Sequence, residues 1–229
     1  MAALIKIGFN RTMHRYVYIF LFFSSFTNNT AFAQDVEPWV FVKEDHGIRV
    51  FTNKSPESPV KEVKVEMLMH TTLSALIALI KDVKNQHKWV YANKTADILK
   101  SVNNFSWVFY GQSEAPWPVS DRDMVALTSL HQDSLTKVVT SVSVGSPDFI
   151  PEVENFVRVP HLNSLWTFTP KGSGNVLVEF VLKIDLGGNI PCWLVNLAIA
   201  KGPHSTIFNM AHELEKPEYK NAHITYIKE

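Results

Sequence analysis

The stretch from Glu114 to Val125, Glu-Ala-Pro-Trp-Pro-Val-Ser-Asp-Arg-Asp-Met-Val, most constrains how this chain can fold. It connects two apolar runs that are typical of strands, Ser106–Tyr110 and Met124–Leu130. Its two prolines cannot donate to a strand ladder, so they end the first run and keep the connection extended. The charges of Asp121–Asp123 then enter a run that otherwise looks buried, where a charge is costly unless it is paired. The stretch therefore predicts either a structural ion pair at a strand end or a polar anchor at the end of a ligand cavity.

Apolar runs with turn signals between them fill the middle of the chain. The strongest strand candidates are Ala96–Val102, Phe105–Tyr110, Met124–Leu130, Lys137–Val144 and Val176–Asp185. Further strands are expected at Trp39–Lys43, Ile48–Thr52 and Val63–Met69, the last from its strict alternation of apolar and charged residues. No helical period separates the central runs, which indicates an antiparallel meander in an α+β protein and not a doubly wound parallel sheet.

Two helices are predicted from apolar stripes at spacings of three and four. The first has Thr71 or Thr72 as its cap and carries Leu73, Leu76, Ile77, Ile80 and Val83. The second, near the C-terminus, carries Trp193, Leu197, Ala200, His204, Ile207, Ala211 and Leu214. Pro203 lies inside this second stripe and predicts a kink there, because proline removes a helical hydrogen bond. The residues after it, His223–Glu229, are expected to form a frayed tail.

Composition narrows the function classes. The chain of 229 residues suits one domain, and 46% hydrophobic against 19% charged residues is typical of a globular protein with a sizeable core. Lys+Arg of 22 balances Asp+Glu of 22, which argues against a strong electrostatic grip on nucleic acid or on anionic membrane. A single cysteine, Cys192, excludes an internal disulfide, and the nine histidines lack metal-ligand spacing.

The amino terminus reads as a secretory signal peptide. Residues 1–15 carry Lys6, Arg11 and Arg15 without an acid, Tyr16–Phe26 is an apolar run, and Ala31-Phe32-Ala33 offers small residues for cleavage. The apolar run is much shorter than the roughly 20 residues of a membrane span. We expect residues 1–33 to be removed and residues 34–229 to form one exported domain, periplasmic or secreted. An uncleaved anchor or an amphipathic presequence is the alternative.

Three motifs occur in an order and spacing that resemble a known family. They are Pro-Trp-Pro-Val-Ser-Asp-Arg-Asp-Met-Val at 116–125, Asn155-Phe-Val-Arg-Val159, and Asp185-Leu-Gly-Gly-Asn-Ile-Pro-Cys-Trp-Leu-Val-Asn196. Together they resemble the steroidogenic-acute-regulatory-related lipid transfer (START) domains, from about Trp39 to about Leu214. The resemblance implies a helix-grip fold, in which a curved antiparallel sheet wraps a long C-terminal helix around a lipid-sized tunnel. It also implies binding and transfer of one lipid, sterol or other hydrophobic molecule, without catalysis.

Candidate site residues follow from the runs and from this resemblance. The expected apolar wall consists of Trp107, Met124, Phe180, Trp193 and Leu197. Arg122 is the first candidate for a headgroup contact, followed by Arg158 and Glu179, although a solvated position at a sheet edge is the commoner case for a residue such as Glu179. Phe149 and Ile150, on the proline-flanked loop 145–153, and Pro203 are candidate gate residues that touch lipid or membrane. An ordinary loop folded over the core is the alternative for residues 145–153.

Two other functions stay open. An enzyme of cyclase or hydrolase type could use the same cavity, with Glu179 or His204 as general base. The sequence offers no zinc-binding His-Glu-x-x-His, no Gly-x-Ser-x-Gly elbow and no phosphate loop, and no cofactor or metal is expected. A sensor or interaction module with a filled interior is the third possibility. A monomer with transient membrane contact is expected.

Overall fold

The computed structural model of the chain describes residues 39–55, 58–190, 195, 199 and 201–229. The predicted signal peptide, residues 1–33, and two predicted wall residues, Trp193 and Leu197, lie outside the described residues. No described helix is long and apolar enough to cross a membrane.

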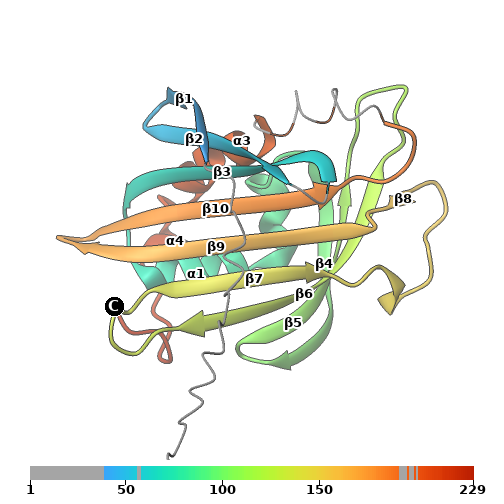
Figure 1. The fold of residues 1–229 in the computed structure, drawn as a ribbon. Coiled ribbons are helices and arrows are strands. Elements are labelled where there is room, and N and C mark those ends of the chain that lie inside the picture. Colours follow the sequence, from blue (N-terminus) through green and yellow to red (C-terminus); the bar gives the residue numbers. More distant parts are fainter. Residues whose placement is uncertain (1–38, 56–57, 191–194, 196–198, 200) are drawn as a thin grey trace, which may run out of the picture. The chain divides into compact units, whose positions relative to one another are not determined.

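One antiparallel sheet with the strand order β1-β2-β3-β10-β9-β7-β6-β5-β4 forms the front layer in Figure 1, and the helices lie behind it. The short strand β8 joins it by pairing in parallel with β6. The strands are β1 (Val40–Asp45), β2 (Ile48–Ser55), β3 (Ser58–His70), β4 (Asn93–Asn103), β5 (Ser106–Ser113), β6 (Arg122–Gln132), β7 (Val139–Gly145), β8 (Val157–Arg158), β9 (His161–Gly172) and β10 (Asn175–Asp185). The predicted α+β class, with a large antiparallel sheet and a C-terminal helix against it, is confirmed.

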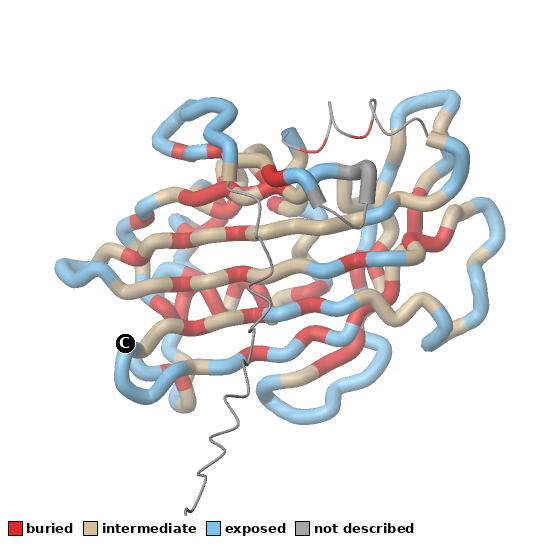
Figure 2. Tube along the Cα trace, in the orientation of Figure 1, coloured by how far each residue is buried: buried red, intermediate tan, exposed pale blue. Residues whose placement is uncertain are grey.

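Alternation along the strands separates an inner face from an outer face. On β10, Val176, Val178 and Phe180 are buried, and they pair in register with Met69, Met67 and Val65 of β3. The residues between them, including Glu179, face the opposite side. Figure 2 shows buried positions alternating with more exposed ones along the central strands of the sheet. The inner face packs against the helices and makes up the main core.

The helices are α1 (Leu73–Lys81), α3 (Lys201–Glu213) and the short α4 (Pro217–Lys220), with 3₁₀ turns η1 (Val83–Lys88) and η2 (Pro147–Phe149). Thr72 caps α1 as predicted, because its Oγ1 accepts a hydrogen bond from the Ala75 backbone N–H at 3.1 Å. All five residues of the predicted apolar stripe, from Leu73 to Val83, are buried. The first predicted helix is therefore confirmed in place and in the face that it buries.

The predicted stripe of the C-terminal helix is only partly right. Ile207 and Leu214 are buried, but His204 and Ala211 are half-buried. The buried residues of this region also include Val195, Ile199, Pro203, Thr206 and Met210. Thr206 faces the core although it is polar, because its hydroxyl accepts a hydrogen bond from the Tyr91 backbone N–H at 3.1 Å. Residue type alone could not reveal that pairing. The chain on the N-terminal side of Lys201, where a kink would show, lies largely outside the described residues.

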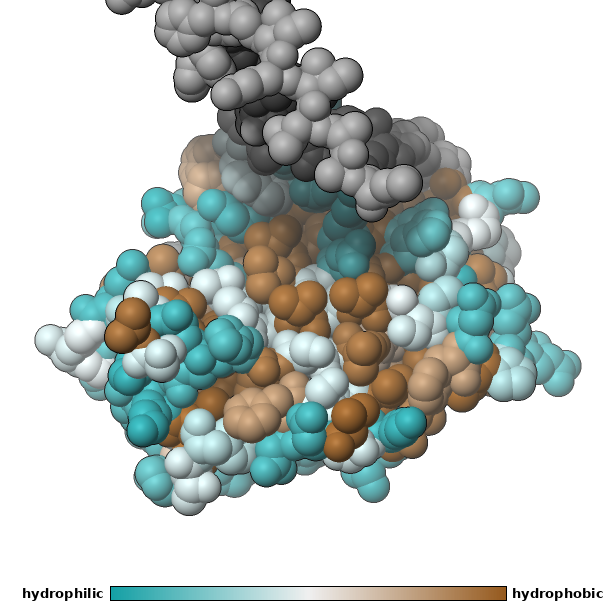
Figure 3. All heavy atoms as spheres, turned by 60° about the horizontal axis from the view of Figure 1, so that its bottom comes forward, coloured by the Kyte–Doolittle hydropathy of each residue, from teal (hydrophilic) through white to brown (hydrophobic). Residues whose placement is uncertain are grey.

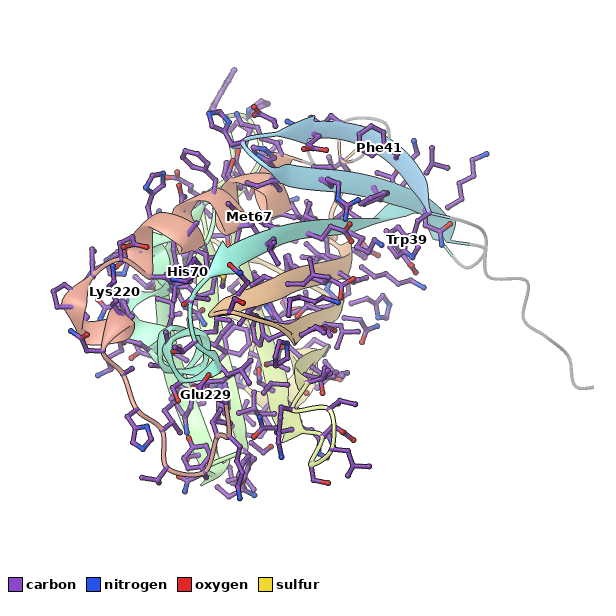
Figure 4. All side chains as sticks on the ribbon, turned by 90° about the vertical axis from the view of Figure 1, so that its left-hand side faces the viewer. Trp39, Phe41, Met67, His70, Lys220 and Glu229 are labelled. Carbon is purple, nitrogen blue, oxygen red and sulfur yellow. The ribbon has the colours of Figure 1, made fainter. Side chains whose placement is uncertain are left out.

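Two further expectations differ from the structure. Strand β9 was not predicted, although it lies between β7 and β10 and carries buried Leu162, Trp166 and Phe168. Pro160 lies just before this run and Pro170 near its end. Because proline is rare inside central strands, these two residues argue against a strand here in spite of the alternating apolar residues. The expected frayed tail is wrong, because residues Ala222–Glu229 form a packed strap, which we call the C-terminal strap. Its Ile227 is buried, and Figure 4 shows Glu229 close to α1.

Candidate functional site

The start of β6 places two neighbouring charges on opposite faces of the sheet. Arg122 and Asp123 pair in register with Ser113 and Gln112 of β5, and with Val157 and Arg158 of β8. Because side chains alternate along a strand, Arg122 faces inward with Met124, and Asp123 faces outward with Val125. Both charged side chains are buried. The two readings of this stretch, an ion pair and a polar anchor, therefore concern two different residues on two different faces.

The outward residue Asp123 forms a buried ion pair with Arg158. The Nε and Nη2 atoms of Arg158 donate to the two carboxylate oxygens at 3.0 and 2.9 Å. The remaining N–H groups donate to the backbone carbonyls of Pro147, Ile150 and Pro151. This accounts for all five N–H donors of the guanidinium. The hydrogen-bonded Asp123 raises the pKa of Arg158. Arg158, predicted as a headgroup contact, has no donor left for a lipid and instead fixes the loop after β7.

The inward residue Arg122 has a different environment. Its Nε donates to the Leu186 carbonyl at 3.3 Å, its Nη2 to the Gly187 carbonyl at 3.2 Å, and its Nη1 to the Ser120 carbonyl. Among the described residues no carboxylate lies within ion-pair distance of it. Burial lowers the pKa of the Arg122 guanidinium, and the negative charge of Asp121 opposes that shift only in part. Arg122 is thus a buried cation that backbone dipoles solvate and that no acid of the described residues neutralises.

Asp121, the acid next to Arg122 in the chain, is committed elsewhere. Its carboxylate accepts hydrogen bonds from Lys94 Nζ at 2.9 Å and from the Ala115 backbone N–H at 3.0 Å. The bond from Lys94 is the main reason why the pKa of Asp121 is lowered. Asp121 therefore closes the base of the connection between β5 and β6, and it leaves Arg122 without a partner acid.

That connection displays a residue that the sequence reasoning did not single out. Trp117 is 93% exposed, although tryptophan is usually at least partly buried. The loop behind it is held by Asp121 and by a hydrogen bond from Val119 N–H to the Pro116 carbonyl at 2.9 Å. Residues 115–120 carry no charge. The signal was present in the sequence, as a tryptophan between two prolines in an uncharged connection.

The candidate gate loop is anchored at both ends to the same part of β6. Ser146 N–H donates to the Val125 carbonyl at 2.8 Å, and Val157 N–H donates to the Asp121 carbonyl at 2.9 Å. Between these anchors the chain bulges outward, with Phe149 46% exposed and Ile150 half-buried. An open depression of about 520 Å³ is lined by Pro147–Glu152, Arg158 and Pro160. Residues 146–157 thus form an Ω-shaped loop whose ends are fixed and whose middle is held only by Arg158.

Apolar residues on the inner face near Arg122 are less covered than the rest of that face. Phe109, Met124, Leu182 and Ile184 are only half-buried, and they pack around a small cluster of Ala126, Val159 and Leu162. Further along the sheet the predicted wall residues Trp107 and Phe180 are buried in the main core, where Phe180 stacks on Trp166 at a centroid distance of 4.0 Å. The structure thus places Met124 near Arg122, and Trp107 and Phe180 deeper in the fold.

Glu179 is not brought together with either arginine. Strand β10 lies between β3 and β9, so Glu179 is not at a sheet edge. It faces outward, level with Glu66 and Thr167 on the neighbouring strands. This outer face also carries exposed apolar side chains, among them Leu127, Val142 and Val144, and Figure 3 shows brown apolar surface between polar side chains on the face turned forward. Neither the predicted edge position nor a cavity position describes Glu179.

The remaining candidates lie on or beside α3. Pro203 is buried in the first turn of the described helix. His204 Nε2 lies 3.5 Å from Asp45 Oδ2 at the tip of the β1–β2 turn, without the geometry of a hydrogen bond. Within the described ranges, no three acidic, histidine or cysteine side chains are arranged to hold a metal ion.

Comparison with known proteins agrees with this geometry. Residues 29–217 match the START domain family. An uncharacterized protein of Pseudomonas aeruginosa is 29% identical over 180 residues, covering 79% of this chain and 88% of that protein. The phosphatidylcholine transfer protein of Bos taurus is 24% identical over 169 residues, covering 72% of this chain and 78% of that protein. The crystal structure of a STAR-related lipid transfer protein from Xanthomonas axonopodis has a TM-score of 0.73 and 25% identity, covering 78% of this chain and 99% of that chain.

Proposed function

Because the chain belongs to the START domain family, we propose that it binds one lipid, sterol or similar hydrophobic molecule in its interior and carries it between membranes without chemical change. The observation that carries this proposal is the inner face near Arg122. Phe109, Met124, Leu182 and Ile184 face inward from four different positions of the sheet and are nevertheless only half-buried. Apolar side chains that face inward and keep accessible surface are what a hydrophobic ligand would cover.

The physical benefit of such a carrier is large. Each methylene removed from water is worth roughly 0.8 kcal/mol, so exposing a long acyl chain costs on the order of 10 kcal/mol. An apolar interior lowers that barrier for a lipid leaving a bilayer. In this proposal Met124 lines the part of the cavity next to Arg122, Trp107 and Phe180 form its deeper wall, and Trp193 and Leu197 complete it. The name of the bovine relative, a phosphatidylcholine transfer protein, supports a lipid cargo.

We further propose that the loop 145–153 and the C-terminal helix gate this interior and meet the membrane. The exposed Phe149 and the fully exposed Trp117 support membrane contact, because an aromatic ring on a loop suits the boundary between lipid headgroups and acyl chains. Pro203 would act within the helix side of the gate. The protein works as a monomer in this scheme.

A catalytic role is less well supported by the geometry. Of the two alternative candidate bases, Glu179 faces outward, away from the interior, and His204 lies on α3 with its Nε2 3.5 Å from Asp45 Oδ2. No described observation favours a reaction over binding, so we propose a non-catalytic carrier.

The test is to load the protein from vesicles and identify the cargo by native mass spectrometry. Protein incubated with phospholipid vesicles, then separated from them, is expected to carry one lipid per chain. The Trp117→Ala variant should load more slowly and reach the same final occupancy, because the side chain touches only solvent in the free protein. The Leu135→Ala variant, which removes another highly exposed apolar side chain, is the matched control. An empty protein after exposure to phospholipid, fatty acid and sterol vesicles would refute the carrier function.

A further inference from the structure

We infer that the ligand of this interior carries an anionic group, a phosphate or a carboxylate, and that this group pairs with Arg122. This inference rests on the proposed function and goes further, because it names the chemical class of the cargo and the residue that selects it. Neutral molecules such as sterols, diacylglycerols and fatty alcohols would then be poor ligands.

The two buried arginines differ in their partners. Arg122 and Arg158 come from paired strands at the same end of the sheet, and both are at least nine-tenths buried. Arg158 has a carboxylate partner at 2.9 Å and protein acceptors for every donor. Arg122 has backbone carbonyls alone. Removing an ion from water costs several kcal/mol, and carbonyl dipoles offset that cost less completely than an opposite charge does.

Arg122 has N–H donors that no described residue accepts from. Its guanidinium has five N–H groups, and three of them have acceptors among the described residues. One N–H on Nη1 and one on Nη2 therefore remain for another acceptor. A guanidinium with two donors available suits phosphate and carboxylate oxygens, which it binds more strongly than neutral acceptors.

The turn beside this cation is built from two glycines, which add no side chain of their own. Gly187 and Gly188 both have positive φ, 64° and 69°, a conformation that other residues rarely adopt. A Cβ atom added to Gly188 would lie 3.6 Å from Arg122 Nη2. A side chain at position 188 would begin in van der Waals contact with the guanidinium and with Val157 Cγ1, 3.7 Å away, whereas glycine adds no atom there.

The Arg122 cation lies at one end of the half-buried apolar group. Arg122 and Met124 lie on the same face of β6, and Met124 belongs to the half-buried apolar group. The acids on either side of Arg122 in the chain are engaged, Asp121 with Lys94 and Asp123 with Arg158. Asp185, next to the turn that Arg122 contacts, accepts a hydrogen bond from the Gly187 backbone N–H at 2.9 Å. A ligand with an acidic head and an apolar tail matches this order of a cation followed by apolar side chains.

The experiment compares matched ligands on the wild-type chain. Affinities are measured for phosphatidic acid against diacylglycerol with the same acyl chains, and for oleate against oleyl alcohol, by competition with a fluorescent lipid near pH 8. We expect the anionic member of each pair to bind at least about tenfold more tightly. In Arg122→Gln the ratio should fall towards one, and in Arg122→Lys it should be reduced but kept. Lys100→Gln, which removes an exposed charge on β4, should leave the ratio unchanged.

Three outcomes would overturn the inference. Equal affinities within each pair on the wild-type chain would do so without any variant, even if Arg122→Gln fails to fold. A preference that survives in folded Arg122→Gln would assign it to another residue. Stabilisation of the protein against unfolding by inorganic phosphate alone, together with equal affinity for both members of each lipid pair, would show a site for a free anion instead. If no member of any pair binds, the proposed lipid function fails as well, so the two failures can be told apart.

Discussion

At the scale of single residues, the neighbours Arg122 and Asp123 divide two tasks between the two faces of one strand. Asp123 neutralises Arg158 on the outer side, and that pair fixes the loop from Pro147 to Pro151. Arg122 on the inner side holds the backbone of Leu186 and Gly187, and it has no counter-charge within the part of the chain that the structure describes. The same residue type therefore serves structure at one position and, in our proposal, recognition at the other.

Replacing Asp123 by asparagine should destabilise the fold strongly. The substitution leaves the Arg158 charge buried and unpaired, and breaking a buried pair in this way costs roughly 3–5 kcal/mol. Urea unfolding followed by tryptophan fluorescence measures the loss. Glu215→Gln, which removes the acid of the exposed Lys220 pair, is the control and should leave the midpoint unchanged. An equal midpoint for Asp123→Asn and wild type would show that the pair does not hold the loop.

At the scale of elements, the C-terminal strap ties α1 to the end of β6, where the β6–β7 turn begins. Lys228 and Gln132 exchange two hydrogen bonds, from Lys228 N–H at 2.9 Å and from Gln132 Nε2 at 2.6 Å. The Glu229 carboxylate accepts from Leu73 and Ser74 N–H groups at 2.8 and 2.9 Å. A carboxylate at this position satisfies free helix N–H groups and opposes the positive end of the helix dipole. Together with Thr72 it caps α1.

The strap predicts that Glu229→Ala lowers stability by roughly 1 kcal/mol, the usual size of a lost helix cap. Thermal unfolding by circular dichroism would detect the shift, and amide exchange should quicken at Leu73 and Ser74 before it does elsewhere. Glu218→Ala, on the exposed side of α4, provides a matched loss of one acid. Unchanged exchange at these two amides in Glu229→Ala would mean that the cap does not form in solution.

At the scale of the whole molecule, the candidate site gathers at one end of the sheet. The loops that carry Trp117 and Phe149 and the Gly187–Gly188 turn all meet the start of β6. The C-terminal strap closes a different part of the fold, against α1 and the β6–β7 turn. In our proposal, the charged anchor and the exposed aromatic rings lie at this one end, so the carrier approaches a membrane with that end first and exchanges its ligand through a single mouth.

The amino-terminal sequence makes a separate prediction for the molecule in the cell. We propose that residues 1–33 direct export and are removed, because a basic segment, an apolar run and Ala31-Phe32-Ala33 follow one another in the order of a signal peptide. Expression in a bacterial host, fractionation and mass spectrometry should recover a periplasmic protein that begins at Gln34. The double variant Ala31→Leu, Ala33→Leu should accumulate uncleaved. Recovery of the full-length chain in the cytosol would contradict the proposal.

Sequence alone determined the features that depend on local pattern. Alternation of apolar and polar residues predicted most strands within a few residues of their ends, and the spacing of Leu73 to Val83 predicted α1 with Thr72 as its cap. The three motifs carried the family, which the match over residues 29–217 shows. These features follow from short-range sterics and periodicity, so they can be read without knowing the partners across the sheet.

The partners of the charged side chains, by contrast, depend on the tertiary structure. The run Asp121-Arg122-Asp123 does not reveal that Lys94 takes the first, that backbone carbonyls take the second, and that Arg158 takes the third. The outward position of Glu179 and the packed C-terminal strap depend likewise on which strand or helix lies beside them. The partner of a charged side chain does not follow from any period in the sequence. It depends on the strand register between distant parts of the chain. For that reason the sequence predicted the same role for Arg122 and Arg158, whereas the fold places them on opposite faces of the sheet with different partners.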